Sequence, residues 1–320
     1  MPSAFITGAT GQDGSYLVDE LGSAGWDVHA LVRKESLEQE QSIPGWVTPH
    51  LGDLLDPAGL ARLIDDIEPD AIFNLAGITS VAQSWEYPDL TARLTGLAVG
   101  TLLEGAWRVQ SRTGRQVRFV QASSSEIFGD SADSPQTEQT PIRPVSPYGA
   151  AKAYAHHLVN VYRARGLFAA SGILYNHESP RRPTSFVTRK ITNGVAKIAA
   201  GKASTISLGN LDAERDWGWA PDYVDALVRI MDAEHPDDFV IATGVAHSVR
   251  DFVDAAFRAA GIDDWESLVE IDERFNRPVD ATKMLGDSSH ANAVLGWEPT
   301  VMFDTVVSRM VEHDLDLVAR

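Results

Sequence analysis

Tyr148 and Lys152 are the first candidates for chemistry, because they stand four positions apart where a helix is expected to begin after Ser146 and Pro147. On a helix this spacing places both side chains on one face. A lysine ammonium beside a phenol stabilises the phenolate and lowers its pKa, so the tyrosine becomes usable as a base near neutral pH. Taken alone, such a pair is more often a surface tyrosine with a solvated lysine, so other residues must decide.

Ser124 and Glu126 form a second group, directly after a strand predicted at residues 117–121. Ligands of open α/β sheets bind at the carboxyl ends of the strands, which is where these two side chains fall. Ser124 and Glu126 therefore place a hydroxyl and a carboxylate at the ligand-binding edge, in the same stretch of chain as Tyr148 and Lys152.

A glycine-rich turn, TGATGQDG at residues 7–14, lies between a short apolar strand at 4–6 and a helical pattern. In this context Gly8 permits a tight turn, Gly11 lets the backbone approach a pyrophosphate, and Gly14 lets the helix pack closely on the strand. The free N–H groups at the start of the helix then face the phosphates. The turn predicts a dinucleotide-binding site.

A second strand, predicted at residues 26–32, ends on Arg33 and Lys34, where NAD-preferring sites usually place an acid. Cations at this point suit the 2′-phosphate of NADP, although two solvated charges after a strand would look the same. A third strand is expected to end at residues 50–54, where Asp53 would face the adenine.

Strands and helices alternate through the first half of the chain, with a helix starting at Asp56 and Pro57, a strand at 71–74, a helical pattern at 88–110 and a strand at 168–175. This alternation predicts an α/β fold, a Rossmann-type doubly wound parallel sheet. The pattern changes after residue 176. We therefore expect an NADP-binding Rossmann domain at 1–176, with segments near 216–245 returning to it, and a smaller C-terminal substrate-binding domain at 177–320.

Composition limits the classes of function. The chain has 320 residues, 44% of them hydrophobic, and a formal net charge of -18, which disfavours binding to nucleic acid or to anionic membrane surfaces. It has no cysteine, which excludes disulfides and thiolate metal sites. The sequence shows no signal-peptide pattern and no apolar stretch long enough to span a bilayer, so we expect a cytoplasmic protein. His156 and His157 are adjacent and point apart on a helix, so no metal site is expected.

Basic residues gather in the second half of this acidic chain: Arg181, Arg182, Arg189, Lys190, Arg215 and Arg277. Guanidinium forks suit phosphate oxygens, so the group could hold a phosphorylated substrate. The alternative is a set of unrelated surface or ion-paired side chains, which are common in proteins and contribute little.

Together these motifs resemble the extended short-chain dehydrogenase/reductases, and among them the GDP-mannose 4,6-dehydratases. The resemblance covers nearly the whole chain. It is carried by GQDGSYL at 11–17, SPYGAAK at 146–152, NHESPRR at 176–182, FVTRK at 186–190 and LGNLDAERDWG at 208–218, with FVIATG at 239–244 and HSVR at 247–250.

The resemblance implies a redox-neutral lyase. Tyr148 is implied to remove the proton of the sugar 4-hydroxyl, with Lys152 tuning it and holding the nicotinamide ribose, while hydride passes from C4 to NADP and later to C6. Glu126 is implied to take the C5 proton and assist the loss of water from C6, a step that a plain dehydrogenase does not need. Ser124 matches the catalytic threonine of the family.

The resemblance also implies the binding residues. Those around NADP are Gly8, Gly11, Gln12, Asp13, Gly14, Arg33, Lys34, Asp53, Leu54, Leu75, Ala76, Gly77, Tyr148, Lys152, His177 and Arg182. Those around a nucleotide sugar, most simply GDP-D-mannose, are Ser80, Asn176, Glu178, Lys190, Arg215, Arg277 and Asp280. The family also implies a homodimer or homotetramer built through the helices of residues 88–110 and 148–165.

The chain departs from the family at four of these places. Ser124 replaces a threonine, Ile78 and Ser80 replace a glutamine and a histidine, and Asp280 replaces a glutamate. Two alternative enzymes therefore stay open: a GDP-4-keto-6-deoxy-mannose reductase, which the run from Arg277 to Asp280 also resembles, and a 4,6-dehydratase for another nucleotide sugar. A non-catalytic binding protein is the third alternative, and the intact catalytic set argues against it.

Overall fold

The computed structural model describes residues 1–34, 43–275 and 278–319. Its largest element within these residues is a seven-stranded sheet in the order β10-β6-β5-β4-β1-β2-β3, in which all neighbouring strands are parallel. The strands are β1 (Ser3–Thr7), β2 (Asp27–Val32), β3 (Thr48–Leu51), β4 (Ala71–Asn74), β5 (Arg118–Ser124), β6 (Phe168–Leu174) and β10 (Asp238–Ile241). The strand order reverses between β1 and β4, the point where such sheets bind ligands. The predicted doubly wound parallel sheet is confirmed.

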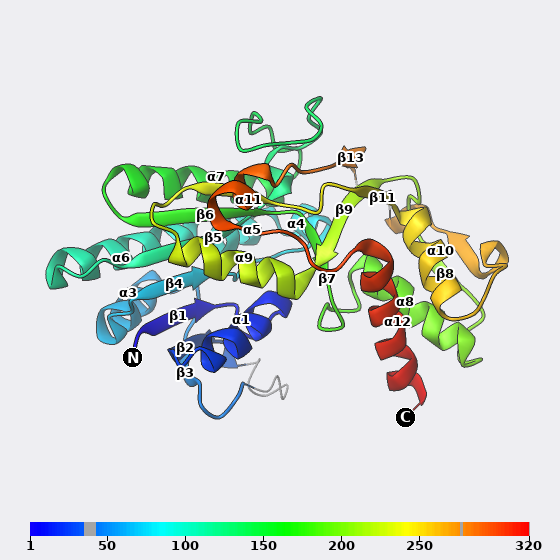
Figure 1. Ribbon diagram of the computed structural model, residues 1–320, viewed down its shortest axis with the longest axis horizontal. Coiled ribbons are helices and arrows are strands. Elements are labelled where there is room, and N and C mark those ends of the chain that lie inside the picture. Colours follow the sequence, from blue (N-terminus) through cyan, green and yellow to red (C-terminus); the bar gives the residue numbers. More distant parts are fainter. Residues whose placement is uncertain (35–42, 276–277, 320) are drawn as a thin grey trace.

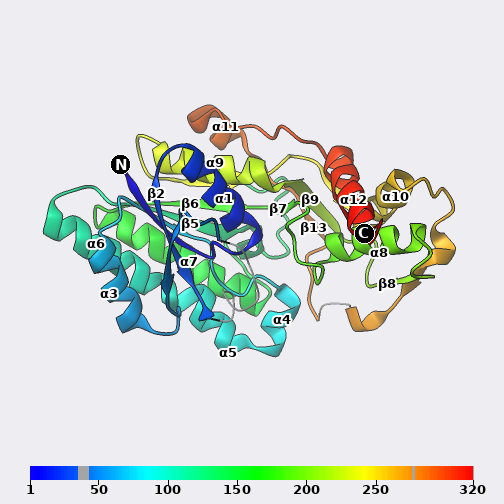
Figure 2. The same ribbon diagram turned by 90° about the horizontal axis from the view of Figure 1, so that it is seen from below.

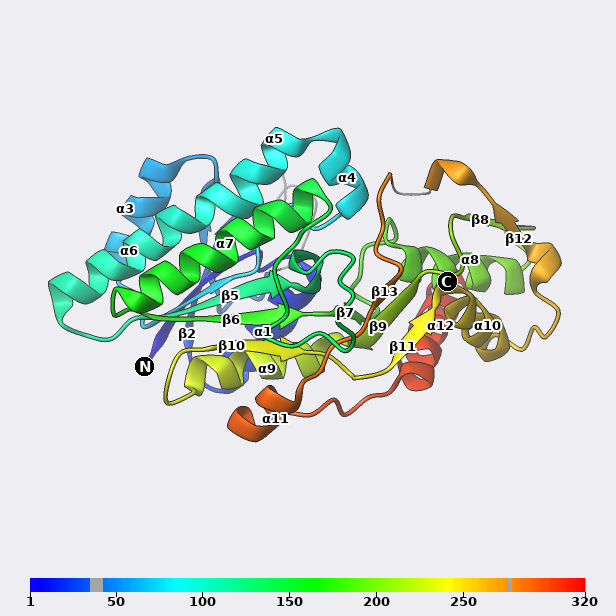
Figure 3. The ribbon, with the colours of Figure 1, turned by 90° about the horizontal axis from the view of Figure 1, so that it is seen from above.

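Helices cover both faces of this sheet (Figure 3). On one face lie α3 (Pro57–Ile67), α6 (Ala98–Thr113) and α7 (Pro147–Ala164), packed on a buried apolar cluster of their own. The other face carries α1 (Gln12–Ser23), α9 (Ala220–Asp232) and the short α11 (Ser289–Leu295). Because both faces are covered, β4 and β6 are buried at every position, whereas β3 at the edge of the sheet is mostly exposed.

The helix starts follow from local chemistry. The side chain of Asp56 accepts a hydrogen bond from Gly59 N at 2.9 Å, and Pro57 stands in the first turn of α3, as predicted. Ser248 and Asp251 form a reciprocal capping box at the start of α10 (Val249–Ala259).

The C-terminal elements form a second group beside the large sheet (Figure 1). α8 (Val187–Ala199), α10 and α12 (Phe303–Ala319) pack on a separate apolar cluster and lie together at the end of the molecule away from α3 and α6 (Figure 2). The short strands in this part are β7 (Asn176–Glu178), β8 (Ile206–Leu208), β9 (Glu214–Trp219), β11 (Ala246–Ser248), β12 (Val269–Ile271) and β13 (Lys283–Met284). α9 and β10 join the large sheet. The boundary at residue 176 stays a prediction.

Several elements differ from those expected. The helical pattern at 88–110 becomes α5 (Pro88–Thr91), a π-helical turn (Ala92–Leu97) and α6, because Thr95 is drawn toward the loop after β4. Ser124 is the last residue of β5 rather than beyond it. The final helix begins at Phe303 rather than Thr300, and α4 (Val81–Glu86), α11, β11 and β13 were not predicted because each is short. No helix of the described residues is long and apolar enough to cross a membrane.

Candidate active site

At the junction between β1 and α1, which we call the cradle, the glycine turn exposes backbone atoms with no side chains over them. Gly8 has a φ of 77°, and a Cβ there would lie 2.8 Å from Ala76 N, so a side chain would collide with the loop after β4. A Cβ on Gly14 would lie 2.1 Å from the carbonyl oxygen of Gly8. Gly11 is the N-cap residue of α1 and has no side chain that could accept a hydrogen bond. The first N–H groups of the helix are therefore not capped by a side chain. Close backbone and free N–H groups fit a dinucleotide pyrophosphate.

Gln12 and Asp13 connect this cradle to β7. Gln12 Nε2 donates to the carbonyl oxygen of His177 at 3.1 Å, and Ser179 Oγ donates to Gln12 Oε1 at 2.9 Å. His177 bonds Tyr175 O through Nδ1 at 2.7 Å and Asp13 Oδ2 through Nε2 at 2.9 Å. Because a carbonyl oxygen and an ionised carboxylate only accept, both ring nitrogens must donate, and His177 is protonated.

The pKa values of this pair agree with that protonation state. Burial alone would lower the pKa of His177, but the charge and hydrogen bond of Asp13 outweigh it and raise the pKa. Burial alone would raise the pKa of Asp13, yet His177 brings it down to about 2. The two residues, both expected near the cofactor, therefore form an ion pair.

The loop after β4 lies against the cradle. Ala76 N donates to Thr7 Oγ1 at 3.2 Å, and Gly77 has a φ of 149°. Thr95, from the π-helical turn, accepts from Ile78 N at 3.0 Å and donates to Ile78 O at 3.2 Å through one hydroxyl. The backbone of residues 75–77 is thereby held beside the glycine turn, where it was expected.

The end of β2 presents the residues expected at the adenosine end. Arg33 and Lys34 follow the last residue of β2 and are exposed. Asp53 is also exposed, and its carboxylate accepts from Leu55 N at 2.8 Å. The side chain of Leu54 belongs to the core beneath α3, so only its backbone can face a ligand.

The four candidate catalytic residues come from β5, the 3₁₀ turn that follows it, and α7. Ser124 ends β5, and its Oγ accepts from Glu126 N at 3.3 Å in the 3₁₀ turn Ser125–Ile127. Tyr148 and Lys152 occupy the first turns of α7 and are both buried. This places a hydroxyl and a carboxylate next to the tyrosine–lysine pair.

The start of α7 is fixed by its cap and by a close approach to β5. Ser146 Oγ accepts from Gly149 N at 3.0 Å, and Pro147 occupies the first turn. A Cβ at Gly149 would lie 2.5 Å from Glu126 O, so the missing side chain lets this turn rest on the Glu126 backbone. The spacing between Glu126 and Tyr148 is therefore set by backbone contact.

Burial dominates the electrostatics of the pair. It raises the pKa of Tyr148 to about 12, against the opposing effect of a hydrogen bond with Ser124, while the nearby Glu126 raises it further. Burial lowers the pKa of Lys152 to about 8. Lys152 Nζ lies 5.8 Å from the centre of the Tyr148 ring and donates to the carbonyl oxygen of Ala122 at 2.6 Å. The prediction that the lysine lowers the pKa of the tyrosine is wrong for this arrangement, because desolvation of the phenol is the larger effect.

Glu178 and Arg182 lie beyond β6. Glu178 is buried, accepts from Thr188 Oγ1 at 2.6 Å, and has its Oε2 3.4 Å from Arg182 Nε. The pKa of Tyr148 is raised overall by burial, but the charge of Arg182 acts in the opposite direction. Arg182 therefore lies near the catalytic pair. Asn176 begins β7 and is half-buried. Glu178, expected at the sugar, thus holds Arg182.

Arg215 and Asp280 face each other across β9 and the segment before β13. Arg215 Nη2 donates to Asp280 Oδ1 at 2.7 Å, and its Nη1 donates to Ala281 O at 2.9 Å. Nη1 also donates to Glu214 O at 2.7 Å, and the side chain is 6% exposed, so these acceptors orient the guanidinium in a nearly dry environment. Arg277 lies outside the described residues.

Lys190 and Ser80 complete the expected substrate set. Lys190 Nζ lies 3.2 Å from the centre of the Phe275 ring, and partial burial lowers its pKa against the opposing charge of Asp272. Ser80 caps α4 by accepting from Gln83 N at 3.2 Å.

Two of the arginines are structural. Arg189 is buried and pairs with the buried carboxylate of Asp314, tying α8 to α12. Arg181 pairs with Asp19 on α1 at 2.8 Å and lies 3.9 Å above the ring of Tyr16. For these two the alternative of ion-paired side chains is the correct interpretation.

Comparison with known proteins agrees with this geometry. A family model described as GDP-mannose 4,6 dehydratase matches residues 5–310. The chain belongs to the GDP-mannose 4,6-dehydratase family. GDP-mannose 4,6 dehydratase 2 of Arabidopsis thaliana is 46% identical over 329 residues, covering 99% of this chain and 88% of the relative. GDP-mannose 4,6 dehydratase of Homo sapiens is 41% identical over 345 residues, covering 98% and 92%. GDP-mannose 4,6-dehydratases are hydro-lyases, and this chain is a lyase.

Solved structures share the fold of this dehydratase-family chain. The UDP-glucose 4-epimerase of Thermus thermophilus in complex with NAD has a TM-score of 0.85 and 26% identity over 98% of both chains. The dTDP-glucose 4,6-dehydratase of Bacillus anthracis in complex with NAD has a TM-score of 0.80 and 18% identity, over 98% of this chain and 96% of that one, which shows the fold alone.

Two site residues of this GDP-mannose 4,6-dehydratase family member escape the sequence analysis. Thr95 sits inside a helical pattern, where a threonine carries no signal; only the small pair Thr95-Gly96 hints at a close approach. Asp216 is buried and accepts from Thr243 N at 2.8 Å, Thr243 Oγ1 at 2.7 Å and Gly244 N at 2.9 Å. It fastens the turn after β10 to β9, next to Arg215.

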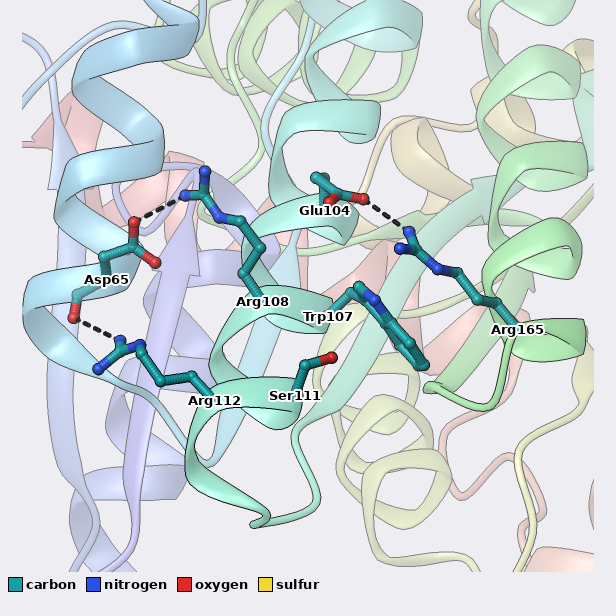
Figure 4. A pocket seen from close by; sticks show the side chains of 7 residues that line it. All are labelled: Asp65, Glu104, Trp107, Arg108, Ser111, Arg112 and Arg165. Carbon is teal, nitrogen blue, oxygen red and sulfur yellow. Dashed lines mark hydrogen bonds and ion pairs between the residues drawn. The ribbon is translucent and has the colours of Figure 1, made fainter.

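A surface hollow lies at the opposite edge of the sheet, between the carboxyl ends of α3, α6 and α7 (Figure 4). It is lined by Asp65, Glu104, Trp107, Arg108, Ser111, Arg112 and Arg165. Arg108 and Arg165 pair with Asp65 and Glu104 at 2.8 Å each, and Arg165 also lies 4.4 Å above the ring of Trp107. These ion pairs join helices, and none of the candidate catalytic or cofactor residues lines the hollow. The described residues contain no cluster of metal-ligating side chains.

Proposed function

We propose that the chain is an NADP-dependent 4,6-dehydratase that converts GDP-D-mannose into GDP-4-keto-6-deoxy-D-mannose. The observation that carries the proposal is the position of Glu126 beside Tyr148 and Lys152 at the carboxyl end of β5. A tyrosine–lysine pair alone supports oxidation of an alcohol, whereas removal of water from the next two carbons needs a second acid–base group.

Tyr148 takes the proton of the sugar 4-hydroxyl. The pKa of Tyr148 is raised to about 12 and that of Lys152 is lowered to about 8. Above pH 8 the phenol and the amine together therefore carry one titratable proton, which either group can hold. Transfer of that proton to Lys152 leaves a phenolate, which the hydrogen bond from Ser124 and the charge of Arg182 stabilise.

Glu126 then removes the proton from C5, which the ketone at C4 has made acidic, and delivers a proton to the hydroxyl that leaves from C6. Bound NADP would supply the hydride chemistry, accepting hydride from C4 and returning it to C6. As the hydride reaches C6, one proton returns to C5, which balances the proton that Tyr148 took from the 4-hydroxyl. The reaction is redox-neutral, so no nicotinamide is consumed. A GDP-4-keto-6-deoxy-mannose reductase, the alternative for the same fold, would consume one NADPH per turnover.

The preference for NADP is supported by the exposed Arg33 and Lys34 at the end of β2. In Arg33→Ala the affinity for NADP should fall by about tenfold while the affinity for NAD stays unchanged, since only NADP carries the extra phosphate. Arg258→Ala, an exposed arginine on α10, is the matched control and should change neither affinity. Equal affinity of the wild type for the two cofactors would contradict the preference.

The substrate side is proposed from charge. Residues 177–320 would form the smaller, mainly nucleotide-sugar-binding domain beside the NADP domain of 1–176. Lys190 and Arg215 of the smaller domain, and Asn176 at the end of the NADP domain, would face the nucleotide sugar. Arg215 would offer its buried guanidinium, and Lys190 its ammonium beside the Phe275 ring, to phosphate or ribose oxygens.

A homodimer or homotetramer of cytoplasmic location completes the proposal. The apolar side chains Leu97, Tyr154 and Val161 are 56%, 47% and 60% exposed on the π-helical turn and α7, which supports pairing through these helices. Light scattering should give at least twice the 34.8 kDa mass of one chain.

The substrate is tested with a panel of GDP-, UDP-, dTDP- and CDP-sugars, incubated separately and examined by mass spectrometry for the loss of one water. GDP-mannose should lose water and the others should not. Loss of water from only a non-GDP sugar would move the assignment to another 4,6-dehydratase.

A further inference from the structure

A chain of side-chain hydrogen bonds crosses the buried centre of the large sheet. Ala76 N donates to Thr7 Oγ1 at 3.2 Å, and Thr7 Oγ1 donates to Asn74 Oδ1 at 2.6 Å. Asn74 Nδ2 donates to Gln121 Oε1 at 2.8 Å, and Gln121 Nε2 donates to Ala122 O at 2.9 Å. The three side chains in this chain are at most 2% exposed.

The strand register makes these contacts possible. Thr7 is the neighbour of Asn74 in β4, and Asn74 is the neighbour of Gln121 in β5. The polar side chains therefore stand at one level on three consecutive strands, on the same face of the sheet. Apolar residues at these buried positions would stabilise the core more than polar ones do, so core packing does not explain the polar row.

The two ends of the chain fix its direction. Ala76 N–H can only donate, and the carbonyl of Ala122 can only accept. Each amide between them must then turn its oxygen toward β1 and its nitrogen toward the Ala122 end. Gln121 has no freedom to reverse, because its oxygen already accepts from Asn74.

The same carbonyl receives the catalytic lysine. Lys152 Nζ, buried at 4% exposure of its residue, donates to Ala122 O at 2.6 Å. Gln121 and Lys152 thus hold one oxygen from two directions, and a displacement of the amide moves the oxygen to which the ammonium is bonded. Lys152 in turn stands within 5.8 Å of the Tyr148 ring.

We propose that Gln121 is a positioning residue for Lys152: it fixes the Ala122 carbonyl that directs the lysine ammonium toward Tyr148, and Thr7 and Asn74 fix Gln121 in turn. The catalytic consequence of this role rests on the proposed dehydratase function. The positional consequence does not, because it concerns only the environment of Lys152 in the folded chain.

Ser171 provides a matched control. It is the neighbour of Gln121 in β6, it is fully buried, and its hydroxyl has no hydrogen-bond partner among the described residues. Ser171→Ala therefore removes a buried polar group from the same row without touching the Ala122 carbonyl.

The experiment titrates Lys152 by NMR of protein labelled with ¹³C at lysine Cε, with the signal assigned by its loss in Lys152→Arg. In Gln121→Met the pKa of Lys152 should fall by roughly 0.5 unit or more, because the Ala122 carbonyl that accepts from the ammonium is no longer fixed by the amide. In Gln121→Glu it should rise, because an anion then adjoins the ammonium. Thr7→Val, which removes the hydroxyl that donates to Asn74 and keeps the side-chain shape, should give a smaller fall if Gln121→Met does not fold. Ser171→Ala should leave the titration unchanged.

The catalytic arm compares the same variants in turnover. Gln121→Met should lower kcat by about tenfold or more with little change in KM, because a misplaced catalytic group affects the chemical step. Ser171→Ala should keep the wild-type kcat. Identical Lys152 titrations in the wild type, Gln121→Met and Gln121→Glu would overturn the proposal. A wild-type protein without dehydratase activity would instead overturn the proposed function and leave the titration result standing.

Discussion

Nε2 of His177 lies 2.9 Å from Oδ2 of Asp13, in an ion pair that joins the glycine turn at the start of α1 to β7. The side chains are 10% and 23% exposed, so water screens the pair only weakly. The segments it joins are 164 positions apart in the chain. The pair therefore connects the glycine turn of the proposed cofactor site to β7, the strand that leads into the C-terminal elements.

We predict that Asp13→Asn lowers the free energy of unfolding by about 2 kcal/mol near pH 6, because it removes a charged hydrogen-bond partner from a buried imidazolium. The raised folded pKa of His177 means that its contribution is complete below the unfolded value of 6.5 and is lost as the pH rises through the folded pKa. The lowered pKa of Asp13 means that its contribution is complete above 3.8 and is lost as the pH falls toward about 2. Urea unfolding should show the largest difference between the proteins from pH 4 to 6.5.

Asp19→Asn is the control for that measurement. Asp19 pairs with Arg181 and also joins α1 to the segment after β7, but its side chain is 52% exposed. Its loss should cost less than about 1 kcal/mol at any pH. Equal losses of unfolding free energy in Asp13→Asn and Asp19→Asn would show that the Asp13–His177 pair stabilises the fold no more than an exposed ion pair does.

Glu126→Gln should block the loss of water while leaving slow oxidation at C4, because the amide cannot take the C5 proton. Absorbance at the wavelength of reduced nicotinamide should rise once and remain, and the sugar should keep its mass. Asp133→Asn, an exposed residue of the following loop, serves as the control. Full dehydration by Glu126→Gln would remove Glu126 from the mechanism.

Thr95→Val should weaken cofactor binding by about tenfold, because the backbone N–H and C=O of Ile78 lose their shared partner and the loop at 75–77 loosens. Thr95→Ser should restore it, since the hydroxyl is kept. Thr91→Val is the matched control, because among the described residues Thr91 Oγ1 bonds only the carbonyl of the N-cap residue of its own helix, Tyr87 O, at 2.8 Å. Nicotinamide fluorescence titration measures the affinity, and equal binding by Thr95→Val and the wild type would contradict the role.

The rate should rise with pH through the neutral range and reach half its maximum near or below the Lys152 pKa of about 8. The rate rises rather than falls with pH because the pair must first lose one proton. Only then can Tyr148 be a phenolate while Lys152 is charged. In Lys152→Arg the guanidinium stays protonated, so the residual rate should lose this rise. A wild-type rate that falls steadily from pH 6 to pH 8 would rule out this assignment.

The sheet and the glycine turn could be predicted from the sequence because their signals are local. Apolar runs, Gly8, Gly11 and Gly14, and the cap at Asp56 each act within a few residues. The short elements β11, β13 and α11 have no such signal, since they form only where other segments offer a partner.

The site was predictable in residue type but not in electrostatics. The motifs identify Tyr148 and Lys152, yet the burial that raises one pKa and lowers the other depends on packing. Arg189 and Arg181 look like phosphate ligands in the sequence because their partners, Asp314 and Asp19, are far away in the chain. Thr95 acts through the backbone of Ile78 in another segment, and Gln121 bonds the carbonyl oxygen of its own neighbour Ala122; no spacing rule reveals either contact.

The most direct test of the proposed function uses GDP-mannose that carries deuterium at C4. The proposed mechanism predicts that the product has lost one water, carries the deuterium in the methyl group at C6, and forms with no net change in nicotinamide absorbance. A product that lacks the label at C6, or that forms only with stoichiometric consumption of NADPH, would contradict internal hydride transfer and with it the assignment as a 4,6-dehydratase.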